Sequence, residues 1–314
     1  MARSTSPSVA DSGTAHHAVP GRSLALHVLL SLRPAQWSKN LLVFAGLLFG
    51  RRLLDPVAVR DAVLAFAVFC VLSGVVYLVN DIADREADQR HPLKSQRPIA
   101  SGALPVPAAA STAFALGTAG LGVAYLVGPA FAGVAVAYLS LQILYSFLLK
   151  NIVIIDVLTI AIGFVLRAVG GAVAVQVEIS HWLLVCTILL ALFIALAKRR
   201  HEIVLLSAGA ASHRSILGEY SPYLLDQMIG VVTASTLISY VFYTISPETQ
   251  AKFGTTWLGL TIPFPIYGIF RYLYLVHQRE GGGSPADMLL TDRPLLACVA
   301  LWALTVALII YRPV

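Results

Sequence analysis

The sequence predicts an all-α integral membrane protein that crosses the bilayer about nine times. Hydrophobic residues make up 58% of the 314 residues and charged residues only 12%, whereas roughly a quarter of a soluble globular chain is charged. The mean hydropathy is +0.79, and apolar runs near the ~20 residues of a spanning helix recur along the chain. This composition excludes a cytosolic enzyme and a disordered scaffold, because too little polar surface exists to cover a soluble particle.

The apolar runs are continuous rather than alternating, which favours helices over the strands of a β-barrel. A helix also satisfies its own backbone hydrogen bonds in lipid. Residues 1–22 are rich in Ser, Ala, Pro and His and are expected to form a flexible cytoplasmic tail, before a single polytopic catalytic domain over 23–314. The expected spans are 37–54, 57–80, 105–127, 129–148, 152–174, 181–198, 222–245, 256–276 and 293–311.

The distribution of basic residues predicts the orientation in the membrane. They concentrate in every second connection, as in cytoplasmic loops. We therefore expect a plasma (inner) membrane protein with its amino terminus in the cytoplasm and its carboxyl terminus outside, although Arg51, Arg52 and Arg60 run against this pattern. Arg33 and Pro34 interrupt the first apolar stretch, which argues against a cleaved signal peptide. Because the net charge of +6 comes from short loops, no nucleic-acid partner is expected.

The strongest chemical feature is the sequence NDIADREAD at residues 80–88, where the second span ends. On a continuing helix, four of its side chains fall within an arc of roughly 100°, namely Asn80, Asp81, Asp84 and Asp88. Carboxylates on one face repel one another unless a positive charge lies between them, and a hard divalent cation with oxygen ligands supplies that charge. Mg²⁺ usually completes its shell with substrate phosphate, so the motif indicates a diphosphate substrate. The alternative is a solvated acidic helix end.

Charged residues also lie within the fifth expected span. Asp156 and Arg167 share one helical stripe but are roughly 16 Å apart, so neither can be the other's only partner. Ionisable groups inside a span normally face a cavity or the interior of the bundle. A polar cavity that faces the cytoplasm and reaches toward the mid-membrane, with Arg167 opposite an anion, satisfies both charges. A structural ion pair between helices is the alternative.

A basic cluster, KRRHE at residues 198–202, ends the sixth expected span. Anchoring of the span at the cytoplasmic surface would by itself explain such a cluster. However, other basic residues are expected on the same side as the acidic motif, namely Lys39, Lys94, Arg97 and Lys150. Phosphate-rich ligands need this positive charge, so the basic residues are candidates for binding the substrate.

About nine spans with the pattern NDxxDxxxD at 80–88 resemble the UbiA-type prenyltransferase superfamily of integral-membrane enzymes. The segment RPAQWSKNLLVF at 33–44, with KN at 150–151, Asp156 and RAVGG at 167–171, is similar to the decaprenyl-phosphate phosphoribosyltransferase branch of mycobacteria and related actinobacteria. The resemblance covers most of the chain from about residue 30. It implies a UbiA-like bundle that moves 5-phosphoribose from phosphoribosyl diphosphate to a polyprenyl (decaprenyl) phosphate, releasing diphosphate, for cell-wall arabinan synthesis.

The resemblance also implies Mg²⁺ as the cofactor, with the ligands Asn80, Asp81, Asp84 and Asp88. Superfamily members that use prenyl diphosphates usually carry a second aspartate-rich motif at the start of the fifth span, whereas here only Asp156 remains. This departure favours a donor that bears an additional phosphate. The nearest alternative is a superfamily member that transfers a prenyl group to an aromatic acceptor, and a transporter is an alternative of another class.

The resemblance assigns roles to single residues. Asp81, Asp84 and Asp156 are the catalytic candidates, and Asp156 is expected to contact the ribose hydroxyls or a second metal. Arg167 is expected to meet the acceptor phosphate, whose lipid tail enters sideways from the bilayer. The candidates for binding substrate are Lys39, Asn80, Lys94, Arg97, Tyr145, Lys150, Arg167, Lys198, Arg199 and Glu202. The acceptor length, the number of metal ions, a monomer or a homo-oligomer, and the role of the loop 278–292 stay open.

Overall fold

The computed structural model describes residues 23–92, 94–206, 215–278, 288 and 291–311. Every regular element in these ranges is an α-helix or a 3-10 helix, and eight helical segments among them are long and apolar enough to cross a membrane. The prediction of an all-α integral membrane protein is confirmed. The expected tail and most of the loop 278–292 lie outside the described residues.

The spanning helices begin at recognisable sequence signals. Proline occupies the first turn of α3, α5, α6, α10 and α14, where its missing N–H would have no helical partner in any case. Asp55, Ser221 and Asp292 cap three of these helices by accepting hydrogen bonds from backbone N–H groups. In chain order the helices are α3 (Pro56–Ala83), α5 (Val106–Val127), α6 (Pro129–Phe147), α7 (Ile155–Ala174), α8 (His181–Leu206), α10 (Pro222–Ile245), α12 (Pro263–Gln278), which η6 (Trp257–Thr261) precedes, and α14 (Arg293–Ile310).

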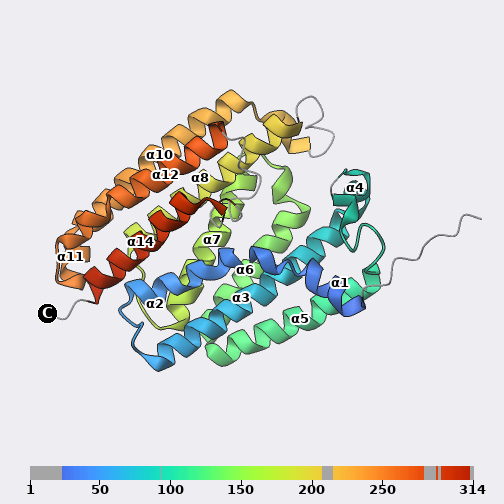
Figure 1. Ribbon diagram of the computed structural model, residues 1–314. Coiled ribbons are helices and arrows are strands. Elements are labelled where there is room, and N and C mark those ends of the chain that lie inside the picture. The colour runs from blue at the N-terminus through green and yellow to red at the C-terminus, as the bar shows by residue number, and fades with distance from the viewer. Residues whose placement is uncertain (1–22, 93, 207–214, 279–287, 289–290, 312–314) are drawn as a thin grey trace, which may run out of the picture.

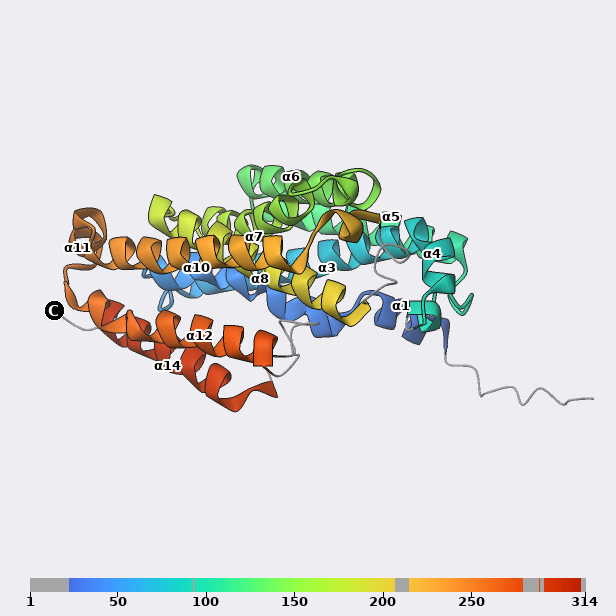
Figure 2. The same ribbon diagram turned by 90° about the horizontal axis from the view of Figure 1, so that it is seen from above.

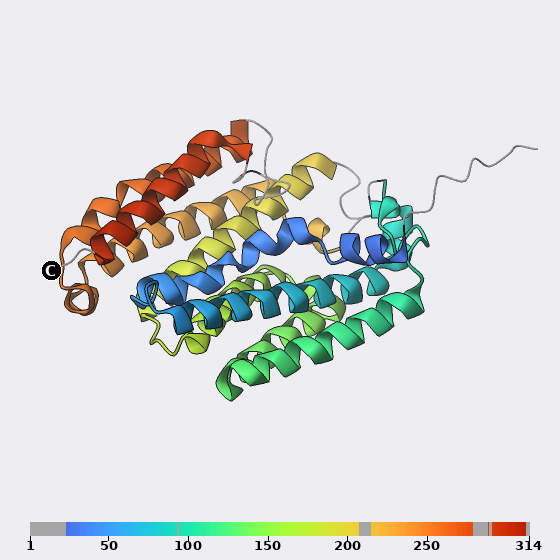
Figure 3. The ribbon, with the colours of Figure 1, turned by 60° about the horizontal axis from the view of Figure 1, so that its bottom comes forward.

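The first expected span, 37–54, differs from the others because it is not one regular helix. After α1 (Leu24–Ser31), the chain forms a 3-10 helix, η1 (Pro34–Phe44), and then the short α2 (Ala45–Phe49). Figure 3 shows this blue segment running beside α3. A 3-10 helix rises about 2.0 Å per residue, against 1.5 Å for an α-helix, so η1 covers more of the membrane thickness than an α-helix of the same length.

Helix α7 lies at the centre of the bundle. It packs against η1, α2, α3, α6 and α8, and α3 and α7 are the most buried of the spanning helices. By contrast, α12 and α14 pack on each other at one edge (Figure 2). Ionisable groups within a membrane belong where protein surrounds them, so the central position of α3 and α7 suits the charged residues Asp81, Asp156 and Arg167 that they carry.

The two ends of the bundle differ in character (Figure 1). The end where α3 finishes, called the motif end below, also holds the short elements α4 (Arg85–Arg90), η2 (Lys94–Gln96), η3 (Leu149–Asn151) and η5 (Ser215–Glu219). The opposite end carries α11 (Pro247–Phe253). Short connecting helices at the motif end bring residues from distant parts of the sequence to the acidic motif.

The contact between η1 and α7 yields a first prediction. A Cβ on Gly171 would overlap the backbone carbonyl of Val43, whereas a Cβ on Gly122, also in a spanning helix, would meet nothing within 4 Å. Overpacking typically costs about 1–3 kcal/mol, so Gly171→Ala should lower the thermal unfolding temperature of the detergent-solubilised protein. Gly122→Ala is the matched control and should leave that temperature unchanged or raise it. Equal unfolding temperatures for the two variants would contradict the close approach of η1 to α7.

Candidate active site

The acidic motif lies where α3 ends. The helix stops at Ala83, Asp84 is its C-cap residue, and α4 begins at the next residue. The backbone N–H of Asp88 donates to the carbonyl of Asp84 at 2.8 Å, so Asp84 both caps the end of α3 and is the N-cap residue of α4. The side chains of Asp81 and Asp88 are nearly buried, and that of Asp84 is about a third exposed. The carboxylates of Asp81 and Asp88 are therefore largely shielded from water, and that of Asp84 is partly exposed.

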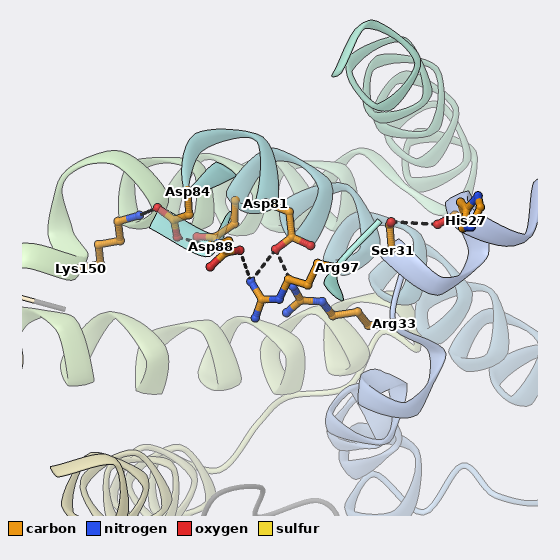
Figure 4. Close-up of polar contacts among 9 residues, drawn as sticks. His27, Ser31, Arg33, Asp81, Asp84, Asp88, Arg97 and Lys150 are labelled. Carbon is orange, nitrogen blue, oxygen red and sulfur yellow. Dashed lines mark hydrogen bonds and ion pairs between the residues drawn. The ribbon is translucent and has the colours of Figure 1, made fainter. Parts of the chain in front are cut away.

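Each of the three aspartates of the motif contacts a basic side chain (Figure 4). Arg33 Nη2 lies 2.5 Å from Asp81 Oδ1. Arg97 Nη1 lies 2.9 Å from the same oxygen and 2.6 Å from Asp88 Oδ2. One guanidinium nitrogen thus bridges the two buried carboxylates and supplies the positive charge that their proximity requires.

Asp84 faces a different cation. Lys150 Nζ lies 2.5 Å from Asp84 Oδ1, and Asn80 Nδ2 donates to Asp84 Oδ2 at 3.2 Å. Lys150 belongs to η3, just before α7. The structure therefore brings together the predicted residues Asn80, Asp84 and Lys150 in one network that joins the ends of α3 and η3.

The donor set of the motif suits a hard divalent cation, since it offers three carboxylates and one amide oxygen. Within the described ranges, however, no three His, Cys, Asp or Glu side chains converge on a common point, and Arg97 occupies the space between Asp81 and Asp88. The residues therefore fit Mg²⁺ by their chemistry, and binding it between these two carboxylates requires Arg97 to move aside.

Arg33 is a site residue that the sequence did not indicate. Its backbone is left-handed, with φ of 53°, at the break between α1 and η1, and its guanidinium carbon lies 4.7 Å from the ring centroid of Tyr77. A residue before proline is restricted in conformation, and Pro34 was the signal in the sequence that marked this break. At this break the Arg33 side chain points toward Asp81 and contacts it.

A second network surrounds Asp156, whose side chain is completely buried. Arg199 Nε donates to Asp156 Oδ2 at 2.8 Å, and Tyr220 Oη donates to Oδ1 at 2.8 Å. Arg199 also donates to Glu202 Oε2 at 2.7 Å and to Tyr145 Oη at 3.3 Å. Four predicted site residues therefore meet here, and Tyr220 is an addition that the sequence did not indicate.

The other basic residues at the end of α8 have partners on different helices. Lys198 Nζ lies 4.0 Å from Glu202 Oε1, on the side of the Asp156 network. Arg200 pairs instead with Asp226 of α10, which His277 also contacts. Of this cluster, Arg199 contacts Asp156 directly, and Lys198 lies near Glu202, the carboxylate that Arg199 also contacts.

Burial raises the pKa of the Tyr220 phenol to about 12. At neutral pH this hydroxyl therefore keeps its proton and can donate it to Asp156. Its oxygen accepts a hydrogen bond from the backbone N–H of Ile154 at 2.7 Å at the same time. A single phenol thus connects the start of α7 with the segment that precedes α10.

Arg167 lies in a third network, deeper in the bundle, and is 6% exposed. Its guanidinium donates to Asn40 Oδ1 at 2.7 Å, the Gly163 carbonyl at 2.8 Å and Tyr138 Oη at 2.8 Å. For Asp156 the structure shows the alternative, an ion pair between helices, because its partner Arg199 lies on α8. All three partners of Arg167 are neutral protein groups, and its expected contact with an acceptor phosphate stays a prediction.

The remaining candidates lie on elements of the motif end or beside it. Lys39 belongs to η1, one residue before the buried Asn40, and Lys94 begins η2, three residues before Arg97. The backbone N–H of Lys94 donates to His91 Nδ1 at 3.3 Å. Lys94 is therefore on the same short connection that presents Arg97 to the carboxylates.

Known proteins share both the sequence and the fold. A family model described as the UbiA prenyltransferase family matches residues 40–291. A decaprenyl-phosphate phosphoribosyltransferase of Corynebacterium glutamicum is 34% identical over 297 residues, which cover 93% of this chain and 89% of that protein. One from Mycobacterium tuberculosis is 35% identical over 295 residues, 91% of this chain and 95% of that protein. A UbiA homolog from Archaeoglobus fulgidus, solved with GPP and Mg²⁺, superposes with a TM-score of 0.71 at 19% identity over 90% of this chain and 99% of that one.

Proposed function

Because this chain belongs to the UbiA prenyltransferase family, we propose that it transfers 5-phosphoribose from phosphoribosyl diphosphate to a polyprenyl phosphate such as decaprenyl phosphate. The bond from the anomeric carbon to the diphosphate oxygen breaks, and a bond to an oxygen of the lipid phosphate forms. The electron pair leaves with the diphosphate. The product would serve cell-wall arabinan synthesis, as the resemblance implies.

The observation that carries this proposal is the environment of Asp156. A second acidic cluster would suit a second metal on a prenyl diphosphate, whereas Asp156 is instead paired with Arg199 and joined to Tyr220. The region around Asp156 and Asp84 contains three basic side chains, since Arg199 contacts Asp156, Lys198 lies near Glu202 and Lys150 contacts Asp84. Such a region favours a donor with a phosphate in addition to its diphosphate, because guanidinium and ammonium groups bind phosphate oxygens strongly.

Two of the basic residues already have carboxylate partners within the chain. Arg97 bridges Asp81 and Asp88, and Lys150 pairs with Asp84. We propose that the donor's phosphates replace these carboxylates as partners of Arg97 and Lys150. Asp81, Asp84, Asp88 and Asn80 then become available to Mg²⁺, which when bound acts as a Lewis acid on the leaving diphosphate, an effect worth several kcal/mol.

The acceptor needs little activation. A lipid phosphate is already anionic at neutral pH, so no strong general base is required. Its hydrocarbon tail stays in the bilayer, since each buried CH₂ contributes about 0.8 kcal/mol to membrane binding. We propose that the motif end faces the cytoplasm, in line with the excess of basic residues there, and that the acceptor reaches the site sideways from the membrane.

The decisive test supplies two labelled donors to the purified protein with polyprenyl phosphate and Mg²⁺. Phosphoribosyl diphosphate labelled in the ribose should yield a labelled lipid. Labelled prenyl diphosphate, offered with an aromatic acceptor, should yield no labelled product. The reverse result would identify an aromatic prenyltransferase, and transport of the donor into proteoliposomes without chemical change would identify a transporter. A single displacement also predicts inversion at the anomeric carbon, which NMR of the product can check.

The bridging position of Arg97 leads to a prediction about metal binding. Arg97→Gln removes the charge that lies between Asp81 and Asp88, so a larger fraction of the substrate-free protein is competent to bind metal. Electron paramagnetic resonance with Mn²⁺ should show binding about tenfold tighter than in the unmodified protein. The KM for phosphoribosyl diphosphate should rise, because a phosphate ligand is lost.

Arg90→Gln is the matched control for charge. Arg90 lies on α4 and is exposed, and its Nε donates to a backbone carbonyl. This variant loses the same charge from the same region without opening the space between the carboxylates. Equal Mn²⁺ affinities for the Arg97 and Arg90 variants would contradict the bridging role.

A further inference from the structure

The turn that leads into α7 has an unusual backbone. Ile154 adopts φ of 70° and ψ of −43°, and a β-branched residue rarely takes a positive φ. Such conformations persist only where the surrounding structure fixes them, and they cluster at functional sites. The turn separates Lys150, which contacts Asp84, from Asp156, which contacts Arg199. Its shape therefore sets the relative position of the two networks.

Tyr220 is the side chain that fixes this turn. Its hydroxyl accepts from the backbone N–H of Ile154 at 2.7 Å and donates to Asp156 Oδ1 at 2.8 Å. A phenol has one proton to donate and can accept as well, so both functions are in use. The ring is buried in an apolar cluster with Val157 and Leu225, and a phenylalanine ring would fill the same space.

The effect of the hydroxyl extends beyond its own contacts. Asp156 accepts a hydrogen bond from Tyr220 on one oxygen and from Arg199 on the other. Arg199 in turn donates to Glu202 and Tyr145. A carboxylate that is fixed on one side orients the guanidinium on its other side. The Tyr220 hydroxyl is therefore connected to both basic groups, to Arg199 through Asp156 and to Lys150 through the turn.

We propose that Tyr220 is a positioning residue, whose hydroxyl holds the start of α7 so that Lys150 and Arg199 are oriented for the phosphates of the donor. This inference rests on the proposed phosphoribosyl transfer. Tyr220 comes directly before the N-cap residue of α10, so this side chain links the segment before α10 to the start of α7.

The test compares Tyr220→Phe with Tyr223→Phe. Tyr223 is 75% exposed and is the matched control. Tyr220→Phe should lower kcat/KM for phosphoribosyl diphosphate about 10- to 100-fold, since small misplacements of binding groups cost up to about a hundredfold. The KM for polyprenyl phosphate should stay unchanged, and Tyr223→Phe should match the unmodified protein in both constants.

A double-variant cycle separates positioning from general destabilisation. If the hydroxyl acts through Asp156, adding Tyr220→Phe to Asp156→Asn should cost much less than it costs in the unmodified protein, because the effects of residues in one network are not additive. Amide hydrogen exchange supplies a readout that does not need activity. In Tyr220→Phe the amide of Ile154 loses its acceptor and should exchange faster in the substrate-free protein.

Three outcomes would overturn the inference: wild-type kinetics in Tyr220→Phe, an equal loss for donor and acceptor, or full additivity with Asp156→Asn. Unchanged exchange at Ile154 would also contradict it, whatever the reaction is. If the unmodified protein instead transfers no label from phosphoribosyl diphosphate, the proposed function fails, and the exchange measurement still tests whether the hydroxyl fixes the turn.

Discussion

Asp81→Asn should lower the rate of phosphoribosyl transfer by at least about a hundredfold, the scale seen when one preorganised electrostatic group is removed from a site. Asparagine has almost the same shape, but it is neutral. Asp81 accepts hydrogen bonds from Arg33 and Arg97, so the variant leaves two guanidinium groups without the charge they share. It also removes a carboxylate ligand from the proposed metal site. Initial rates with labelled phosphoribosyl diphosphate measure the effect.

Asp61→Asn is the control for this variant. Asp61 lies on the same helix near its other end and pairs with Arg60, so the substitution removes an identical charge far from the motif. Its rate should equal that of the unmodified protein. Gel filtration of both variants should give a single peak at the unmodified position. An active Asp81→Asn protein, or full activity after exhaustive chelation of divalent ions, would exclude the proposed role of the motif.

Arg199→Gln should cause the largest loss of stability among the substitutions considered. Its guanidinium is 3% exposed and pairs with the fully buried Asp156. Removing one partner of a buried ion pair typically costs about 3–5 kcal/mol, because the other charge is left uncompensated. The thermal unfolding temperature should therefore fall clearly, and donor turnover should be lost with it.

A second substitution tests the origin of this loss. In Arg199→Gln with Asp156→Asn, no buried charge is left unpaired, so much of the stability should return while turnover stays low. Lys198→Gln serves as the control for stability, because Lys198 is 42% exposed and surface substitutions usually change stability by about 0.5 kcal/mol or less. An unfolding temperature for Arg199→Gln equal to that of Lys198→Gln would contradict the buried pair.

The apolar runs of the sequence located the spanning helices closely, since length and hydropathy alone determine which segments can cross a bilayer. The expected span 57–80 corresponds to α3 at Pro56–Ala83, and 222–245 to α10 at Pro222–Ile245. The exception is 37–54. Hydropathy cannot reveal that Asn40 within this run is bonded to Arg167, or that Gly171 brings α7 against Val43.

The site was predictable in its residue types but not in its pairings. Helical periodicity placed Asp81 and Asp88 on one face, and Arg97 does bridge them, although α3 ends at Ala83 and Asp88 lies on α4. However, the cations that meet them are distant in sequence, as Arg33 precedes Asp81 by 48 residues and Lys150 follows Asp84 by 66. Tyr220 carried no signal, because one tyrosine before a helix start is unremarkable without the turn that it contacts. Such pairings depend on the tertiary arrangement, which the sequence pattern does not encode locally.

The irregular segment η1 has a consequence for biogenesis. Its buried Asn40 is bonded to Arg167, which lies 127 residues later in the chain. A ribosome adds about 5–20 residues per second, so roughly 6 to 25 seconds separate the synthesis of these two residues. During that interval a segment that contains Lys39 and Asn40 is a poor independent membrane anchor. Asn40 already finds a partner on α3, since its Nδ2 donates to Ser73 Oγ at 3.2 Å, whereas its carbonyl oxygen meets Arg167 only after α7 has been made. The early nascent chain therefore depends on α3 for its attachment to the bilayer.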